Sequence, residues 1–116
     1  MGHVTVKVII RGKEEYVANL LVDTGASFTV LPLKLAEKLL YKTPYTVELR
    51  LGDGRRVTAQ VYVGEVEVEG RKGPVRTLAF PDAHPVIGID TLETLGLKVD
   101  PTTGKIEKTE HYMLYV

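Results

Sequence analysis

The chain has 116 residues, 44% of them hydrophobic, and its 15 Lys and Arg residues balance 15 Asp and Glu residues to a formal net charge of zero. This length and composition predict a single folded domain over residues 1–116. The balance lacks the excess of Lys and Arg with which proteins usually bind nucleic acid or anionic membranes, so neither partner is expected. Cys is absent, which excludes disulfides, cysteine nucleophiles and thiolate metal sites.

No apolar run approaches the roughly 20 residues that span a bilayer, and the start MGHVTVKVII lacks the charged region and cleavage site of a signal peptide. We therefore expect a soluble, cytoplasmic protein. His3, His84 and His111 stand singly, without the paired spacing of metal sites, and are interpreted as loop or surface residues. Neither a metal nor a cofactor is expected.

The first half of the chain reads as two strands followed by a helix. Residues 4–10 alternate with a period of about two, which predicts a strand, and the turn RGKEE follows. Residues 16–22 return as an apolar strand that delivers Asp23 into a loop. Pro32 suits the first position of a short helix whose apolar side is carried by residues 33–40.

A long hairpin is predicted over YTVELRLGDGRRVTAQVYV, residues 45–63, because apolar and polar residues alternate on both sides of a glycine-rich bend. The bend falls at Gly52-Asp53-Gly54, where Asp-Gly is a strong hairpin signal. Two further strands are expected, one continuing to residue 68 and one over residues 75–80, with a turn over residues 70–74 between them.

The stretch DAHPVIGIDTLETLGLKVD changes from an apolar strand at residues 86–87 to the pattern of a short helix. Asp90 and Glu93 resemble a capping box, and Gly96 occupies the position of a C-terminal glycine. A last hairpin is expected through DPTTG, followed by the apolar tail YMLYV. Many short strands with two short helices predict an all-β fold, a small barrel or sandwich.

Asp23 is the residue that needs an explanation. It follows three apolar residues and should be poorly solvated, which disfavours its anion unless the site uses it. Asp, Thr and Gly are also ordinary turn residues, and alone Asp23-Thr24-Gly25 would be interpreted as a turn. The combination of an apolar strand feeding Asp23, a glycine-tipped hairpin and a second apolar pair before a helix favours a functional role.

That combination resembles the retropepsins, the retroviral-type aspartic proteases. The motifs that carry the resemblance are LVDTGAS and VIGID followed by TLETLG, and they span most of the chain. The resemblance implies a small closed β barrel with one or two short helices, acting as a homodimeric aspartic endopeptidase on peptides or unfolded proteins. It departs from many retroviral members at Ser27, where they carry a second acid, and at Ile89, where they carry an arginine.

The resemblance also implies roles for individual residues. Asp23 would be the catalytic acid, Thr24 would lock the two active-site loops together, and Gly25 would contact the substrate through its backbone. The hairpin tip would be a flap closing over the peptide. The residues expected to bind substrate are Ala26, Ser27, Gly52, Asp53, Gly54, Val86 and Ile87.

The chemistry itself requires a second carboxyl group. Hydrolysis by water needs one group to take a proton from the water and another to protonate the carbonyl oxygen. An Asp with an ordinary pKa of about 3.9 is ionised near neutrality and supplies only the base. The chain carries one Asp-Thr-Gly, so the second carboxylate must come from another copy across a twofold axis. Two anions about 3 Å apart repel by about 5 kcal/mol at an effective dielectric constant near 20, so the pair holds one proton, the established pattern of aspartic proteases.

The prediction also covers the two ends of the chain and leaves two alternative functions open. The resemblance implies that Met1–Val6 and Tyr112–Val116 form a sheet between the subunits, which would protect the apolar tail. One alternative is a catalytically silent peptide-binding or scaffold module of the same fold. The other is a metal-assisted hydrolase built on Asp23, for which no further ligands have a suitable spacing.

Overall fold

The computed structural model describes residues 4–100 and 102–109. Its two helices are α1 (Leu33–Leu39) and α2 (Ile89–Thr94). The strands are β1 (Thr5–Arg11), β2 (Glu15–Asp23), β3 (Thr29–Pro32), β4 (Tyr41–Arg50), β5 (Arg56–Val68), β6 (Arg71–Phe80), β7 (Val86–Gly88), β8 (Leu97–Val99) and β9 (Ile106–Lys108).

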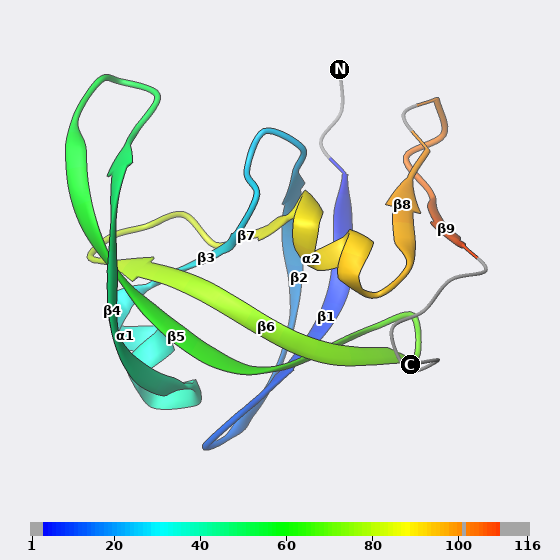
Figure 1. The fold of residues 1–116 in the computed structure, drawn as a ribbon. Helices are drawn as coiled ribbons and strands as arrows, with labels where there is room; N and C mark the ends of the chain where they lie inside the picture. The colour runs from blue at the N-terminus through cyan, green and yellow to red at the C-terminus, as the bar shows by residue number, and fades with distance from the viewer. Residues whose placement is uncertain (1–3, 101, 110–116) are drawn as a thin grey trace.

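The main sheet closes on itself. Its strands run in the order β1-β2-β7-β3-β6-β5-β4, and a further pairing of β1 with β5 joins the ends of the first six. Among the described strands, β4 pairs only with β5 and stands outside the closed barrel (Figure 1). The pairings of β2 with β7 and of β3 with β6 are parallel, and the other pairings are antiparallel. The predicted all-β barrel with two short helices is confirmed.

Two hydrophobic clusters fill the fold. The larger one joins the inward faces of β1 and β2 to both helices. Val6, Val8 and Ile10 alternate inward on β1, and Leu92 and Leu95 of the α2 region belong to the same cluster. The smaller one lies under the β4–β5 hairpin, around the buried side chains of Ala59 and Leu78. The hairpin is therefore anchored by a core of its own.

The starts of both helices differ from the prediction. Pro32 is the residue before α1 and still pairs with Phe80 as the end of β3, so it does not take the first helical position. Asp90 lies inside the first turn of α2 and makes no capping hydrogen bond. The reason is that α2 begins at Ile89, so Gly88 takes the capping position, and the carbonyl oxygen of Ala26 accepts a hydrogen bond from the N–H of Ile89.

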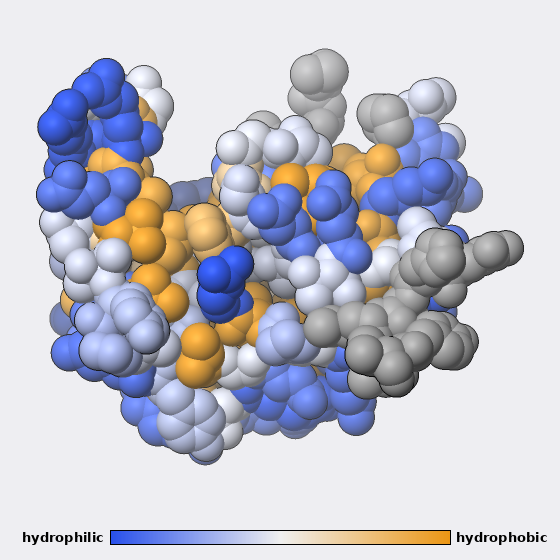
Figure 2. Space-filling model, in the orientation of Figure 1, coloured by the Kyte–Doolittle hydropathy of each residue, from blue (hydrophilic) through white to orange (hydrophobic). Residues whose placement is uncertain are grey.

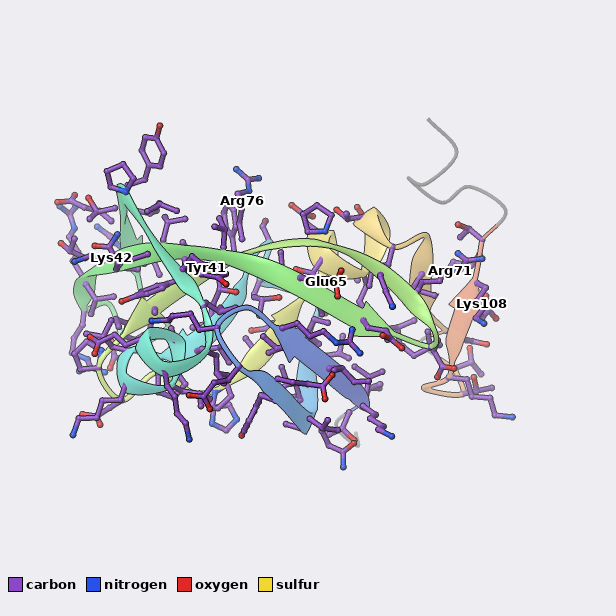
Figure 3. The ribbon with its side chains drawn as sticks, turned by 90° about the horizontal axis from the view of Figure 1, so that it is seen from below. Tyr41, Lys42, Glu65, Arg71, Arg76 and Lys108 are labelled. Carbon is purple, nitrogen blue, oxygen red and sulfur yellow. The ribbon has the colours of Figure 1, made fainter. Side chains whose placement is uncertain are left out.

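The predicted C-terminal hairpin is confirmed as β8 and β9, and Gly96 takes the left-handed conformation, with φ of 67°, expected after a helix. Arg71 fastens this hairpin to α2, because its guanidinium donates to the carbonyl oxygens of Leu95, Gly96 and Thr109 (Figure 3).

The chain ends predicted to form an intersubunit sheet fall largely outside the described residues, which exclude 1–3 and 110–116. Within the described part, Thr5 and Val6 pair with Leu21 and Leu20 of their own chain. Val6 belongs to the barrel core and is 7% exposed. Residues 5 and 6 therefore belong to the barrel of their own chain, and the predicted sheet between subunits stays a prediction.

Candidate active site

Asp23 is the last residue of β2, beside the last residue of β7. The two strands are parallel and their register places Asp23 opposite Gly88. Val22, one residue earlier, points into the core, and Asp23 is half-buried rather than enclosed as the sequence suggested. The apolar residues before Asp23 therefore form strand β2, and the end of this strand places the Asp23 carboxyl at the protein surface.

Backbone hydrogen bonds fix the loop after Asp23. The N–H of Gly25 donates to Asp23 Oδ1 at 2.9 Å, and the N–H of Ala26 donates to the Asp23 carbonyl oxygen at 3.1 Å. The Ala26 carbonyl oxygen then accepts from the N–H of Ile89 at 2.9 Å, which ties the loop to the start of α2. One carboxylate oxygen of Asp23 is thus held by the backbone, and Oδ2 accepts no hydrogen bond from another described residue.

A close contact between β7 and the same loop supports this arrangement. A Cβ atom on Gly88 would lie 2.5 Å from the carbonyl carbon and oxygen of Phe28 and 2.6 Å from the carbonyl oxygen of Ser27. Only glycine permits so close an approach of two backbones. Beneath it, the buried hydroxyls of Thr29 and Thr91 lie 2.8 Å apart, and Thr29 Oγ1 accepts a longer bond of 3.4 Å from the N–H of Gly88.

A cleft of about 500 Å³ opens beside Asp23. Figure 2 shows hydrophobic surface gathered below the hydrophilic tip of the β4–β5 hairpin, where this hollow lies. The cleft is lined by Leu21, Asp23, Ala26, Val30, Leu49, Leu51, Arg55, Val57, Phe80, Pro81, Asp82, Ala83, His84 and Val86. Leu49 and Val57 are cross-strand partners, so the underside of the hairpin presents an apolar face to the cleft.

The hairpin tip is a loop over residues 51–55 in which Gly54 has a φ of 88°, as the Asp-Gly signal predicted. Asp53 accepts hydrogen bonds from the backbone N–H of Arg55 at 3.0 Å and from its Nε at 2.7 Å. These two bonds, the backbone one first, lower the pKa of the Asp53 carboxyl from its ordinary value. The tip therefore carries an ordered ion pair.

The cleft unites only part of the predicted site. Asp23, Ala26 and Val86 line it, while Gly52, Asp53 and Gly54 form the tip of the hairpin above it without lining it. Leu51 and Arg55, at the two ends of the tip loop, do line the cleft, so the hairpin remains the element that covers the cleft.

Ser27 and Ile87 do not line this cleft. Ser27 lines a second hollow with Phe28 and Arg76, whose guanidinium lies 5.2 Å from the centre of the Phe28 ring and which projects from β6 in Figure 3. Ile87 is completely buried in the main core, because neighbouring residues of a strand point to opposite faces. Ile87 is accordingly left out of the proposed substrate site.

Several cleft residues were not anticipated. The alternation of the hairpin placed Leu49, Leu51 and Val57 on one face, and that pattern could have marked them as the flap underside. Arg55 and His84 carried no such signal, because which loop residues reach a cleft depends on how the hairpin and the β6–β7 connection fold over it. His84, expected to be a loop residue, is exposed in that connection.

One face of the site is open in the single chain. Thr24, Gly25 and Ser27 are exposed next to the half-buried Asp23. The Thr24 side chain makes no hydrogen bond with any other described residue. The loop that carries the acid therefore has a free surface on the side away from β7.

Metal and membrane features were searched within the described ranges. Residues 4–100 and 102–109 contain no group of three or more His, Asp or Glu side chains arranged to hold a metal ion. Neither α1 nor α2 has the length and apolar character needed to cross a membrane.

Comparison with known sequences agrees with this geometry. The profile of a family described as aspartyl protease matches residues 6–99, which include the Asp23 loop, the hairpin and β7. No curated protein matches the chain closely enough for comparison. Given the match over most of its length and the closed barrel that presents Asp23 at a cleft, the chain belongs to the retropepsin-like aspartyl protease family.

Proposed function

We propose that the protein is an aspartic endopeptidase that hydrolyses peptide bonds as a homodimer, with one Asp23 carboxyl from each subunit. One observation carries the proposal: Asp23 lines a largely apolar cleft, oriented by the Gly25 N–H, beside an exposed loop face. An isolated carboxylate at such a place has no acid to work with. A second copy that packs on the exposed face supplies one.

The chemistry follows from the symmetry of the pair. Two identical carboxyl groups in contact share one proton, and the titration belongs to the pair rather than to either residue. The ionised group removes a proton from the attacking water, and the protonated group donates to the carbonyl oxygen of the peptide. The hydrogen bond from Gly25 leaves the second oxygen of Asp23 available for this exchange.

Thr24 and the cleft complete the proposal. The exposed Thr24 side chain is the group that would bond across the twofold axis and lock the two loops together. The substrate would lie extended between the Asp23 loop and the hairpin, with apolar side chains against Val30, Leu49 and Val57. Peptides or unfolded proteins with apolar residues beside the scissile bond are the substrates that fit.

A subunit-mixing experiment tests both the residue and the dimer. Asp23→Asn keeps the size of the side chain and removes the acid, so the variant should not cleave a peptide library. When wild-type and variant subunits are mixed equally and exchange freely, wild-type homodimers make up about one quarter of all dimers. Activity at constant total protein should therefore fall to about one quarter, whereas independently active subunits would retain about one half.

Inhibition completes the test. A statine-type mimic of the tetrahedral intermediate should inhibit the wild-type protein, and a metal chelator should not. Wild-type protein that binds peptides without cleaving any of them would instead support the silent binding module. Cleavage by Asp23→Asn at the wild-type rate would refute the assignment of the catalytic residue.

A further inference from the structure

Arg55 is the one Arg or Lys side chain that lines the cleft within the described residues. It comes from the hairpin tip, while the other ionisable lining residues besides Asp23, which are Asp82 and His84, come from the loop between β6 and β7. The Arg55 side chain is largely exposed, so it reaches the edge of the cleft while its charge stays hydrated. Its hydrogen-bonding geometry indicates a use for that charge.

The Asp53 carboxylate bonds only the Nε side of the Arg55 guanidinium. The Arg55 Nε donates to Asp53 Oδ2 at 2.7 Å, and the Arg55 backbone N–H donates to Asp53 Oδ1 at 3.0 Å. The two terminal nitrogens, Nη1 and Nη2, donate to no other described residue. A guanidinium held through Nε still offers these two parallel donors, which match the two oxygens of a carboxylate.

We propose that Arg55, oriented by Asp53, is a carboxylate receptor at the flap and makes the enzyme select peptides that carry a carboxylate near the apolar residues of the cleft. This inference rests on the proposed function for its substrate, a peptide. The carboxylate is either an Asp or Glu side chain or the C-terminus of the peptide. Asp82, in the other loop, repels a carboxylate, so the attraction is local to the flap side.

The neighbouring Arg56 provides a matched control. Leu49 and Val57 face the cleft as cross-strand partners, so the next pair outward, Arg50 and Arg56, projects from the opposite face of the hairpin. Arg56 is exposed and does not line the cleft. Arg55→Gln and Arg56→Gln therefore change the net charge equally, one residue apart, but only Arg55→Gln removes a side chain that lines the cleft and is paired with Asp53.

The experiment measures binding as well as cleavage. Fluorescent peptides share one apolar core and differ by Glu against Gln at each flanking position, with an amidated C-terminus. A second pair carries Gln throughout and differs by a free against an amidated C-terminus. Dissociation constants are measured on full-length Asp23→Asn protein, and kcat/KM is measured on the chain with Asp23 intact.

We expect a preference of about fivefold for a carboxylate at one position, the size of a well-formed ion pair at a partly exposed site. Arg55→Gln should abolish the preference, Arg55→Lys should restore part of it, and Arg56→Gln should keep it. A preference confined to the free C-terminus would identify the terminal carboxylate as the ligand. Thermal unfolding of each variant verifies that the fold is retained.

The outcomes separate this inference from the proposed function. A Glu preference in binding without cleavage of any peptide would retain the receptor and reject the protease. Cleavage with equal rates for Glu and Gln peptides, and for free and amidated ends, would retain the protease and overturn the receptor. Absence of peptide binding, or equal loss of preference in Arg55→Gln and Arg56→Gln, would also overturn it.

Discussion

Replacing Gly88 by alanine tests whether the contact between β7 and the Asp23 loop keeps Asp23, the proposed catalytic group, in place. The added Cβ would lie 2.5 Å from the carbonyl carbon and oxygen of Phe28, whereas ordinary van der Waals contact begins at 3.4 Å. Relief therefore requires a backbone displacement of about 1 Å, and overpacking of this kind costs about 1–3 kcal/mol of the free energy of unfolding. Gly88 is the register partner of Asp23, so the displacement falls on the acid.

The expected loss of activity exceeds the loss of stability. A misplacement of about 1 Å at a catalytic group lowers the rate by about 100-fold, so kcat/KM of Gly88→Ala should fall by about that factor in protein that is still folded. The assay is cleavage of a fluorogenic peptide, at a temperature well below the unfolding midpoint measured for each variant by circular dichroism.

Gly12→Ala is the matched control. A Cβ on Gly12 would meet the carbonyl oxygen of Leu39, a clash with backbone as severe as that at Gly88. Gly12 lies in the turn between β1 and β2, at the end of β2 opposite to Asp23 (Figure 1). Both variants should lose similar stability, but Gly12→Ala should keep its activity within about threefold. Equal loss of activity in both folded variants, or full activity in Gly88→Ala, would refute the reasoning.

Three further predictions follow from the same structure. Thr29→Val leaves the Thr91 hydroxyl without its partner and should lower the free energy of unfolding, measured by urea titration, by about 1–3 kcal/mol. Thr77→Val removes a buried hydroxyl that has no partner among the described residues, so in the same titration it should be neutral or stabilising. The N–H of Thr102 lowers the pKa of Asp100, so the stability that this carboxylate contributes is present above its unfolded pKa of about 3.9 and is lost as the pH falls through the lower folded value. Asp100→Asn should therefore be less stable than wild type at pH 7, and the difference should shrink as the pH falls below about 3.9. Dilution below the dissociation constant of the dimer should abolish cleavage while the circular dichroism spectrum stays that of a folded barrel, because the core clusters lie within one chain.

The local periodicity of the sequence predicted most of the strands, because burial on one side of a barrel imposes a period of two. It missed β3 and placed a turn over residues 70–74, where β6 has already begun at Arg71. The alternation of β1 and of the β4–β5 hairpin indicated both the strands and their inward faces. Closure of the barrel was not visible in these patterns. It depends on the pairing of β1 with β5 and the insertion of β7 between β2 and β3, which are contacts between residues far apart in the chain.

The errors at the starts of both helices have one physical origin, a contact with a distant part of the chain. Pro32 pairs with Phe80 of β6, so it ends a strand instead of beginning a helix. Asp90 has the sequence signature of a cap, but the carbonyl oxygen of Ala26, far away in the sequence, bonds to the helix start instead. Ile87 shows the same limit, because an apolar pair does not reveal which member of the pair points to the core. Sequence patterns predict which local structures a segment can form, and contacts with distant parts of the chain determine which of these structures is formed.

The β4–β5 hairpin is the part of the described fold that can open most easily to admit a substrate without disturbing the main core. Strand β4 pairs on one side only and has no fully buried residue, and the small cluster under the hairpin is separate from the main core. Regions with few buried contacts open locally at the lowest free energy. The Asp23 loop, by contrast, is bonded to α2 and packed against β7, which belong to the main core. A hairpin that moves while Asp23 beneath it stays fixed is the arrangement that the proposed function requires of a flap over a bound peptide.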